Sequence, residues 1–292
     1  MSIFNVFILA IVQGLAELLP VSSSAHVVVA EKLMGLDPSS PPMTLLLVML
    51  HTGTMFAVIA YFWKQWRATY FSTAAAFKAI AVRLVVATAI TGIVGEAIVK
   101  VLERTALRGV PHAEIEDLFG HLEFIAPALA AAGLLILIAG LRERRLNAAA
   151  RSDSGELTPA DASIIGAVQG LCLPFRGFSR SGATISTGML LGVSKPRAER
   201  FSFALAVVLT PPVVAREALR LMHAPPGVAT PAQGSLQSVA LLSVFGAVLA
   251  FVAGLLALKW LSRWLESGLW HLFGVYCLVA AVGVALLHYH GF

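Results

Sequence analysis

Long apolar stretches constrain the fold of this chain more than any other feature of its sequence. A helix that crosses a bilayer needs about 20 mainly apolar residues. Six stretches meet this requirement, and each is bounded by charged residues, proline or glycine: 43–63, 77–99, 122–141, 201–222, 239–261 and 269–287. Only 13% of the residues are charged, against about 25% in a typical soluble domain. The sequence therefore predicts an all-α polytopic membrane protein with six transmembrane helices.

Two further apolar regions are interrupted and do not qualify as simple spans. Residues 2–36 are broken at Leu19-Pro20-Val21-Ser22-Ser23-Ser24, and residues 160–193 are broken within 174–182, which contains proline, glycine, serine and arginine. A half-length helical pair of this kind can enter a membrane and return to the same side if its irregular backbone is enclosed by protein. We expect each region to form a re-entrant helical hairpin.

Basic residues indicate the orientation, because Lys and Arg collect in cytoplasmic loops. If the six spans are threaded in order, one side receives the following residues: Lys64, Arg67, Lys78, Arg83, Arg142, Arg144, Arg145, Arg151, Lys195, Arg197, Arg200, Lys259 and Arg263. Both termini then lie outside the cytoplasm. The net charge is +5, but no basic stripe with interleaved aromatics is present, so we expect no nucleic-acid partner.

An internal repeat supports this threading. The sequence Ala-Ile-Val-Gln-Gly-Leu at 10–15 is matched by Gly-Ala-Val-Gln-Gly-Leu at 166–171, and a proline and a serine-rich break follow each copy. Because the two hairpins enter from opposite faces, the repeat has inverted topology, which places a binding site where the broken elements meet. We therefore expect one membrane domain, 1–292, with repeats at 1–141 and 160–292.

Glu17 lies in the first arm of the first hairpin. An ionisable residue at such a depth is unfavourable by about 2.5–3.5 kcal/mol and is most often functional. The alternative is a structural carboxylate held by a backbone or hydroxyl donor. Gln13 precedes Glu17 by one helical turn, so both side chains share a face.

Ser22, Ser23 and Ser24 follow the first break. Serines at a helix start are most often caps, but the free N–H groups there also attract anions. His26 lies one turn further and can donate or accept a proton, although a lone membrane histidine is most often packed and hydrogen-bonded. The cluster is a candidate catalytic centre.

The second break supplies positive charge. A guanidinium binds phosphate oxygens with a fork of donors, and glycines allow close backbone approach. The second break contains arginines and glycines with hydroxyl residues among them: Arg176, Gly177, Ser179, Arg180, Ser181, Gly182 and Thr184. Their composition predicts a phosphate site with Arg180 as its main cation. For Arg176 two roles are equally favoured: binding phosphate, or snorkelling to the membrane interface. Cys172 and Cys277 match no metal or disulfide spacing, so we expect buried thiols.

Residues 13–26 (QGLAELLPVSSSAH) and 177–184 (GFSRSGAT) closely resemble the two signature motifs of the bacterial undecaprenyl-diphosphate phosphatases associated with bacitracin resistance. The resemblance covers essentially the whole chain. It implies hydrolysis of a polyprenyl diphosphate lipid to the monophosphate and inorganic phosphate, in a bacterial inner membrane with the active site facing the periplasm or exterior. Two departures from the pattern are Arg176 in place of a proline and Ala25 in place of a common glycine.

The resemblance also implies roles for individual residues. Glu17, Ser23, His26 and Arg180 match the catalytic set, and Glu17 would hold a divalent cation, Mg²⁺ or Ca²⁺. The expected substrate-binding residues are Gln13, Ser22, Ser24, Gly177, Ser179, Ser181 and Thr184. The main alternative function is a polyprenyl-phosphate flippase, because inverted repeats with broken helices also build transporters. The sequence leaves the oligomeric state open, a homodimer included.

Overall fold

The protein is described by a computed structural model that covers residues 2–37, 40–105, 121–148, 155–222 and 236–291. Within these ranges the chain forms ten helices, and its only β-structure is an isolated bridge between Gly155 and Val193. The helices are α1 Ile3–Leu18, α2 Ser23–Leu33, α3 Pro41–Thr69, α4 Ala74–Thr105, α5 Leu122–Ala148, α6 Pro159–Cys172, α7 Arg180–Leu190, α8 Lys195–Met222, α9 Leu236–Glu266 and α10 Trp270–Tyr289.

Five helices in the described ranges are long and apolar enough to cross a membrane: α3, α4, α5, α9 and α10. The expectation of a polytopic helical membrane protein is therefore confirmed in this coarser form. The sixth expected span, 201–222, lies in α8, which is a continuous helix but not one of the five. This helix begins with several charged residues and contains Pro211 and Pro212 in its second half.

Apolar side chains cover much of the outer surface of these helices. Val85 of α4, Ile93 of α4 and Val279 of α10 are each more than 60% exposed. Such a surface would be unfavourable in water but is the expected one for helices that contact lipid.

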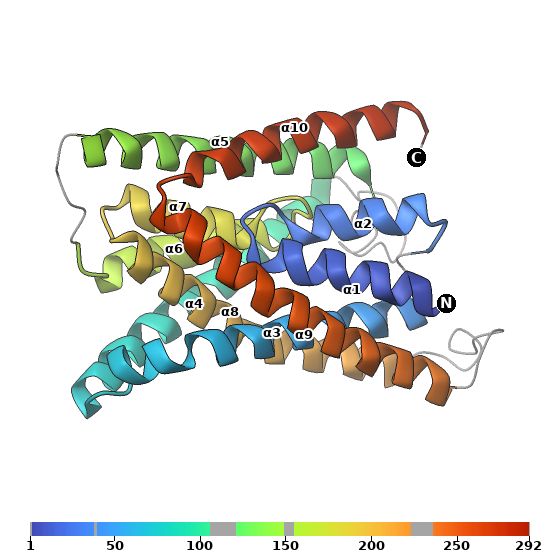
Figure 1. The fold of residues 1–292 in the computed structure, drawn as a ribbon, viewed down its shortest axis with the longest axis horizontal. Helices are drawn as coiled ribbons and strands as arrows, with labels where there is room; N and C mark the ends of the chain where they lie inside the picture. Colours follow the sequence, from blue (N-terminus) through green and yellow to red (C-terminus); the bar gives the residue numbers. More distant parts are fainter. Residues whose placement is uncertain (1, 38–39, 106–120, 149–154, 223–235, 292) are drawn as a thin grey trace.

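The four shorter helices form two hairpins. Helices α1, α2, α6 and α7 contain 16, 11, 14 and 11 residues, so even the longest reaches only about 24 Å at 1.5 Å per residue. Helices α1 and α2 lie at one end of the molecule and α6 and α7 towards the other, with their connecting segments near the middle (Figure 1). Helices α5 and α10 run side by side along one face, and both described ends of the chain lie at the same end.

Glycines allow each hairpin to approach a long helix closely. A Cβ on Gly14 of α1 would lie 2.5 Å from the Cβ of Ala253 in α9, and one on Gly170 of α6 would lie 2.7 Å from the carbonyl oxygen of Thr91 in α4. These two glycines occupy the same position in the repeated Val-Gln-Gly-Leu sequence. The glycine that the two copies of the repeat share therefore has a packing role in each hairpin.

We predict that Gly170→Val lowers the stability of the protein by about 1–3 kcal/mol, because added methyl groups would overlap the backbone of α4. Thermal unfolding in detergent micelles measures the effect. The matched control is Gly92→Val, since a Cβ at Gly92 has no atom within 4 Å. Equal melting temperatures for the two variants would contradict the proposed close packing.

Candidate active site

The break between α1 and α2 is formed by local backbone chemistry. Proline lacks the N–H that would continue a helix, and Pro20 follows the end of α1 at Leu18. Ser22 then adopts a φ of 69°, a left-handed conformation that non-glycine residues rarely take. The Ser22 hydroxyl accepts a hydrogen bond from the Ala25 N–H and so caps the start of α2. The chain turns back on itself within four residues.

The break between α6 and α7 has the same elements. Pro174 follows α6, and Gly177 takes a φ of 100°. A Cβ on Gly177 would lie 2.5 Å from the carbonyl oxygen of Ile125, so only glycine fits at this point. The Ser179 hydroxyl accepts from the Gly182 N–H at 3.2 Å and caps the start of α7.

The two breaks contact each other directly. The Gly177 N–H donates to the Ser24 hydroxyl at 3.1 Å, and the Ser181 hydroxyl donates to the Leu19 carbonyl at 3.4 Å. The irregular backbone of each hairpin is therefore partly satisfied by the other. This contact brings the starts of α2 and α7, with their unsatisfied N–H groups, to one place.

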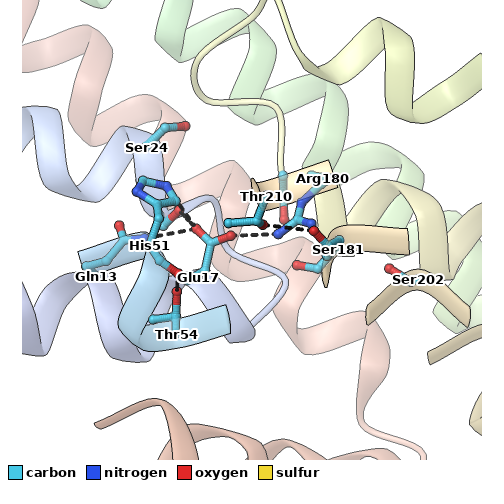
Figure 2. A network of polar contacts seen from close by, with 12 residues as sticks. Gln13, Glu17, Ser24, His51, Thr54, Arg180, Ser181, Ser202 and Thr210 are labelled. Carbon is cyan, nitrogen blue, oxygen red and sulfur yellow. Dashed lines mark hydrogen bonds and ion pairs between the residues drawn. The ribbon is translucent and has the colours of Figure 1, made fainter. Parts of the chain in front are cut away.

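Glu17 is the centre of the polar network between the hairpins. Its Oε1 accepts from Arg180 Nη2 at 2.6 Å, and its Oε2 accepts from Ser23 Oγ at 2.5 Å and from Gln13 Nε2 at 3.1 Å. The His51 Nε2 atom lies 3.6 Å from Oε2. Figure 2 shows Glu17 between Arg180 on one side and His51 on the other. Of the predicted catalytic residues, the structure brings Glu17, Ser23 and Arg180 into direct contact.

The Glu17–Arg180 pair is largely removed from water, with 13% of the Glu17 side chain and 22% of the Arg180 side chain exposed. A buried charge that loses its partner is destabilising by several kcal/mol, whereas an intact pair is close to neutral. A guanidinium has five N–H donors. Arg180 can therefore hold Glu17 and still bind further oxygen atoms.

His26 is placed differently from the other predicted catalytic residues. Its Nδ1 lies 2.7 Å from the Ser22 carbonyl oxygen, and its Nε2 lies 2.6 Å from the Tyr276 hydroxyl of α10. The structure gives it no hydrogen bond to Ser23, whose hydroxyl is bonded to Glu17. His26 lies beside the network rather than within it.

The other predicted residues line or support the breaks. Ser22 and Ser24 lie 3.2 Å apart through their hydroxyl oxygens. Thr184 is fully buried, donates to the Arg180 carbonyl and lies 2.6 Å from the Ser202 hydroxyl of α8. Thr184 thus holds the first turn of α7 against α8.

Several residues of the site were not predicted from the sequence. His51 and Thr54 of α3 lie near Glu17, and the Thr54 hydroxyl donates to the His51 carbonyl (Figure 2). A signal for these two was present, because His51-Thr52-Gly53-Thr54 interrupts an apolar span and ionisable residues at such positions are costly. Tyr276 and Ser202 carried no comparable signal, since only the fold brings them to the hairpins.

Oxygen atoms beside Glu17 fit a divalent cation. Gln13 is 1% exposed, its amide nitrogen donates to Glu17, and its Oε1 is buried without a hydrogen-bond partner. Carboxylate and amide oxygens are ligands that Mg²⁺ and Ca²⁺ prefer, although the Gln13 amide presents its nitrogen to Glu17. The described residues contain no group of three or more His, Cys, Asp or Glu side chains that could hold a metal ion. Both cysteines are buried and free, as expected.

The fold and this network define a class: a polytopic helical membrane protein with a serine, a carboxylate and an arginine gathered between two broken hairpins. Comparison with known families assigns the chain more narrowly. The family described as Bacitracin resistance protein BacA matches residues 6–283, so the chain belongs to that family.

Relatives named as undecaprenyl-diphosphatases match over nearly their full length. Undecaprenyl-diphosphatase 2 of Acinetobacter baylyi is 57% identical over 286 residues, which is 98% of each chain. An undecaprenyl-diphosphatase of Anaeromyxobacter is 33% identical over 100% of this chain and 90% of its own length. An undecaprenyl-diphosphatase of Gluconacetobacter diazotrophicus is 34% identical over 96% of this chain and 95% of its own.

We predict that Arg180→Ala lowers stability by about 3 kcal/mol, because it leaves the buried Glu17 carboxylate without its counter-charge. The double variant Glu17→Ala/Arg180→Ala should recover part of that loss, since it removes both charges. Unfolding of the wild type, both single variants and the double variant in micelles forms a double-mutant cycle. Strictly additive effects would show that the ion pair does not couple the two hairpins.

Proposed function

We propose that the protein hydrolyses undecaprenyl diphosphate to undecaprenyl phosphate and inorganic phosphate, an activity that recycles a lipid carrier used in cell-wall synthesis. The observation that carries the proposal is the Ser23–Glu17–Arg180 contact, in a chain that is 57% identical to an undecaprenyl-diphosphatase. A carrier for lipid phosphates needs a cation but has no use for a serine hydrogen-bonded to a carboxylate. The flippase alternative is therefore not favoured.

Ser23 is the proposed nucleophile. Its hydroxyl already donates to Glu17 Oε2 at 2.5 Å, so the carboxylate is in position to accept the proton as the oxygen attacks the terminal phosphorus. The bond from that phosphorus to the bridging oxygen breaks, and the lipid monophosphate leaves with the electron pair. Water then attacks the phosphoserine and releases inorganic phosphate. The competing route is direct attack by water, with Ser23 only holding phosphate.

Arg180 and the two helix starts are the proposed anion-binding groups. Phosphoryl transfer depends mainly on positioned positive charge and N–H donors around the equatorial oxygens. Arg180 supplies a guanidinium, and the starts of α2 and α7 supply backbone N–H groups. The binding set proposed around them is Gln13, Ser22, Ser24, Gly177, Ser179 and Ser181. Thr184 would act indirectly, because its hydroxyl bonds to the Arg180 carbonyl.

His26 is proposed as the residue that exchanges a proton with water or with the departing phosphate, rather than with Ser23. Its Nε2 faces the Tyr276 hydroxyl at 2.6 Å, on the α10 side of the hairpin. The two residues that handle protons are therefore separate. Glu17 would accept the proton of Ser23, and His26 would exchange a proton with water or with the departing phosphate.

A divalent cation, Mg²⁺ or Ca²⁺, is proposed beside Glu17. Glu17 and the Oε1 of Gln13 would hold it. When bound, such an ion would offset the negative charge of the phosphate oxygens.

We also propose the finer membrane arrangement. Helix α8 is the sixth span, the two hairpins are re-entrant, and repeats 1–141 and 160–292 are related by inverted topology within a single membrane domain. In support, α1 packs on α9 as α6 packs on α4, and both ends of the described chain lie at the same end of the molecule. The basic loops then face the cytoplasm of a bacterial inner membrane, and the site opens to the exterior.

We predict that the purified protein releases phosphate from a polyprenyl diphosphate and that chelation of divalent cations suppresses the release. Ser23→Ala should lower kcat by several orders of magnitude with little change in KM, because the loss falls on the transition state. Phosphate assays and a search for trapped phosphoserine measure both effects. The control Ser267→Ala changes an exposed serine between α9 and α10. If Ser23→Ala turned over like the wild type, Ser23 would not be the nucleophile.

We predict that Ser24→Cys reacts with a membrane-impermeant thiol reagent added from outside the cell, because the first hairpin enters from that face. The background is a Cys172→Ala/Cys277→Ala variant, which removes both native thiols. Ser267→Cys, in the short connection between α9 and α10, should react only after the membrane is permeabilised. Labelling in the reverse pattern would require the opposite orientation.

A further inference from the structure

The contact between His26 and Tyr276 joins the first hairpin to α10. The Tyr276 hydroxyl lies 2.6 Å from His26 Nε2, and the two rings are stacked with centroids 5.7 Å apart and planes 10° apart. The residues are 250 positions apart in sequence. Tyr276 is 47% exposed, so its ring lies at the edge of the helix packing and not in the core.

The other ring nitrogen of His26 determines which tautomer is present. Nδ1 lies 2.7 Å from the Ser22 carbonyl oxygen, which can only accept a hydrogen bond. Nδ1 must therefore carry a proton. In the neutral ring Nε2 then has a lone pair, and the Tyr276 hydroxyl must be the donor to it.

This arrangement holds the His26 ring at both nitrogens. The Ser22 carbonyl belongs to a residue with a left-handed φ of 69°, so the turn aims that carbonyl at the ring. Tyr276 holds the opposite nitrogen from a different helix. A side chain held at both ends has one orientation, which general acid–base catalysis requires.

We propose that Tyr276 is a positioning residue for His26. Its hydroxyl donates to the Nε2 lone pair and fixes the tautomer and direction of the ring until water or the departing phosphate replaces it at Nε2, and it thereby acts on turnover through the histidine. The inference rests on the proposed function, because it needs His26 to handle a proton during phosphate release. Tyr276 itself exchanges no proton with the substrate in this scheme.

The test is a double-mutant cycle on turnover. Tyr276→Phe removes one oxygen atom and keeps the stacked ring, so kcat should fall about tenfold with little change in KM. In a His26→Ala background the same change should have no further effect, because the group through which Tyr276 acts is gone. An equal loss of kcat in both backgrounds would overturn the inference, as would wild-type turnover in either single variant.

Tyr61→Phe is the matched control. The Tyr61 hydroxyl lies 2.6 Å from the Ser262 hydroxyl, between α3 and α9, so the change removes an equally short tyrosine hydrogen bond away from the hairpins. It should leave kcat unchanged. A loss of kcat equal to that of Tyr276→Phe would show a general effect on packing and would overturn the positioning role.

A measurement without turnover separates this inference from the proposed function. The ¹⁵N resonance of His26 Nε2, identified by its loss in His26→Ala, should shift in Tyr276→Phe as the lone pair loses its donor. An unchanged resonance overturns the inference even if phosphate is released. If Tyr276→Phe shifts the resonance but the wild-type protein releases no phosphate, the proposed function is overturned instead.

Discussion

The ion pair between Glu17 and Arg180 is the interaction on which the rest of the site depends. Each charge lies on a different hairpin, and the two are joined at 2.6 Å in a region largely removed from water. Neither residue could remain charged there alone without a large free-energy cost. The pair therefore explains why the two breaks must meet: each hairpin supplies the counter-charge that makes the other's buried ion acceptable.

Much of this could be predicted from the sequence, because the signals are chemical and local. Span length identifies α3, α4, α5, α9 and α10, while proline and serine locate the breaks. A carboxylate and a guanidinium within apolar regions must find partners, so both Glu17 and Arg180 could be assigned to a site from the sequence, but their ion pair with each other was not predicted. Residues 201–222 were predicted as a span in the same way, but α8, with its charged start and paired prolines, is not among these five helices.

Partners that depend on the packing of distant helices could not be predicted. The sequence suggested that His26 serves Ser23, because one helical turn separates them, but side chains on one helix also face its neighbours. Ser23 bonds back to α1 through Glu17, and His26 bonds across to Tyr276 of α10. Sequence spacing restricts which residues share a face, and only the helix arrangement decides what that face meets.

Arg176 extends the same reasoning to the departure from the family pattern. Glu31 of α2 is fully buried, neither of its carboxylate oxygens has a hydrogen-bond partner, and it interacts electrostatically with Arg176. This second interaction between opposite charges again runs from the first hairpin to the second break. An arginine at 176 therefore does more than replace a rigid turn residue: it offsets a carboxylate that the low-dielectric interior would otherwise disfavour.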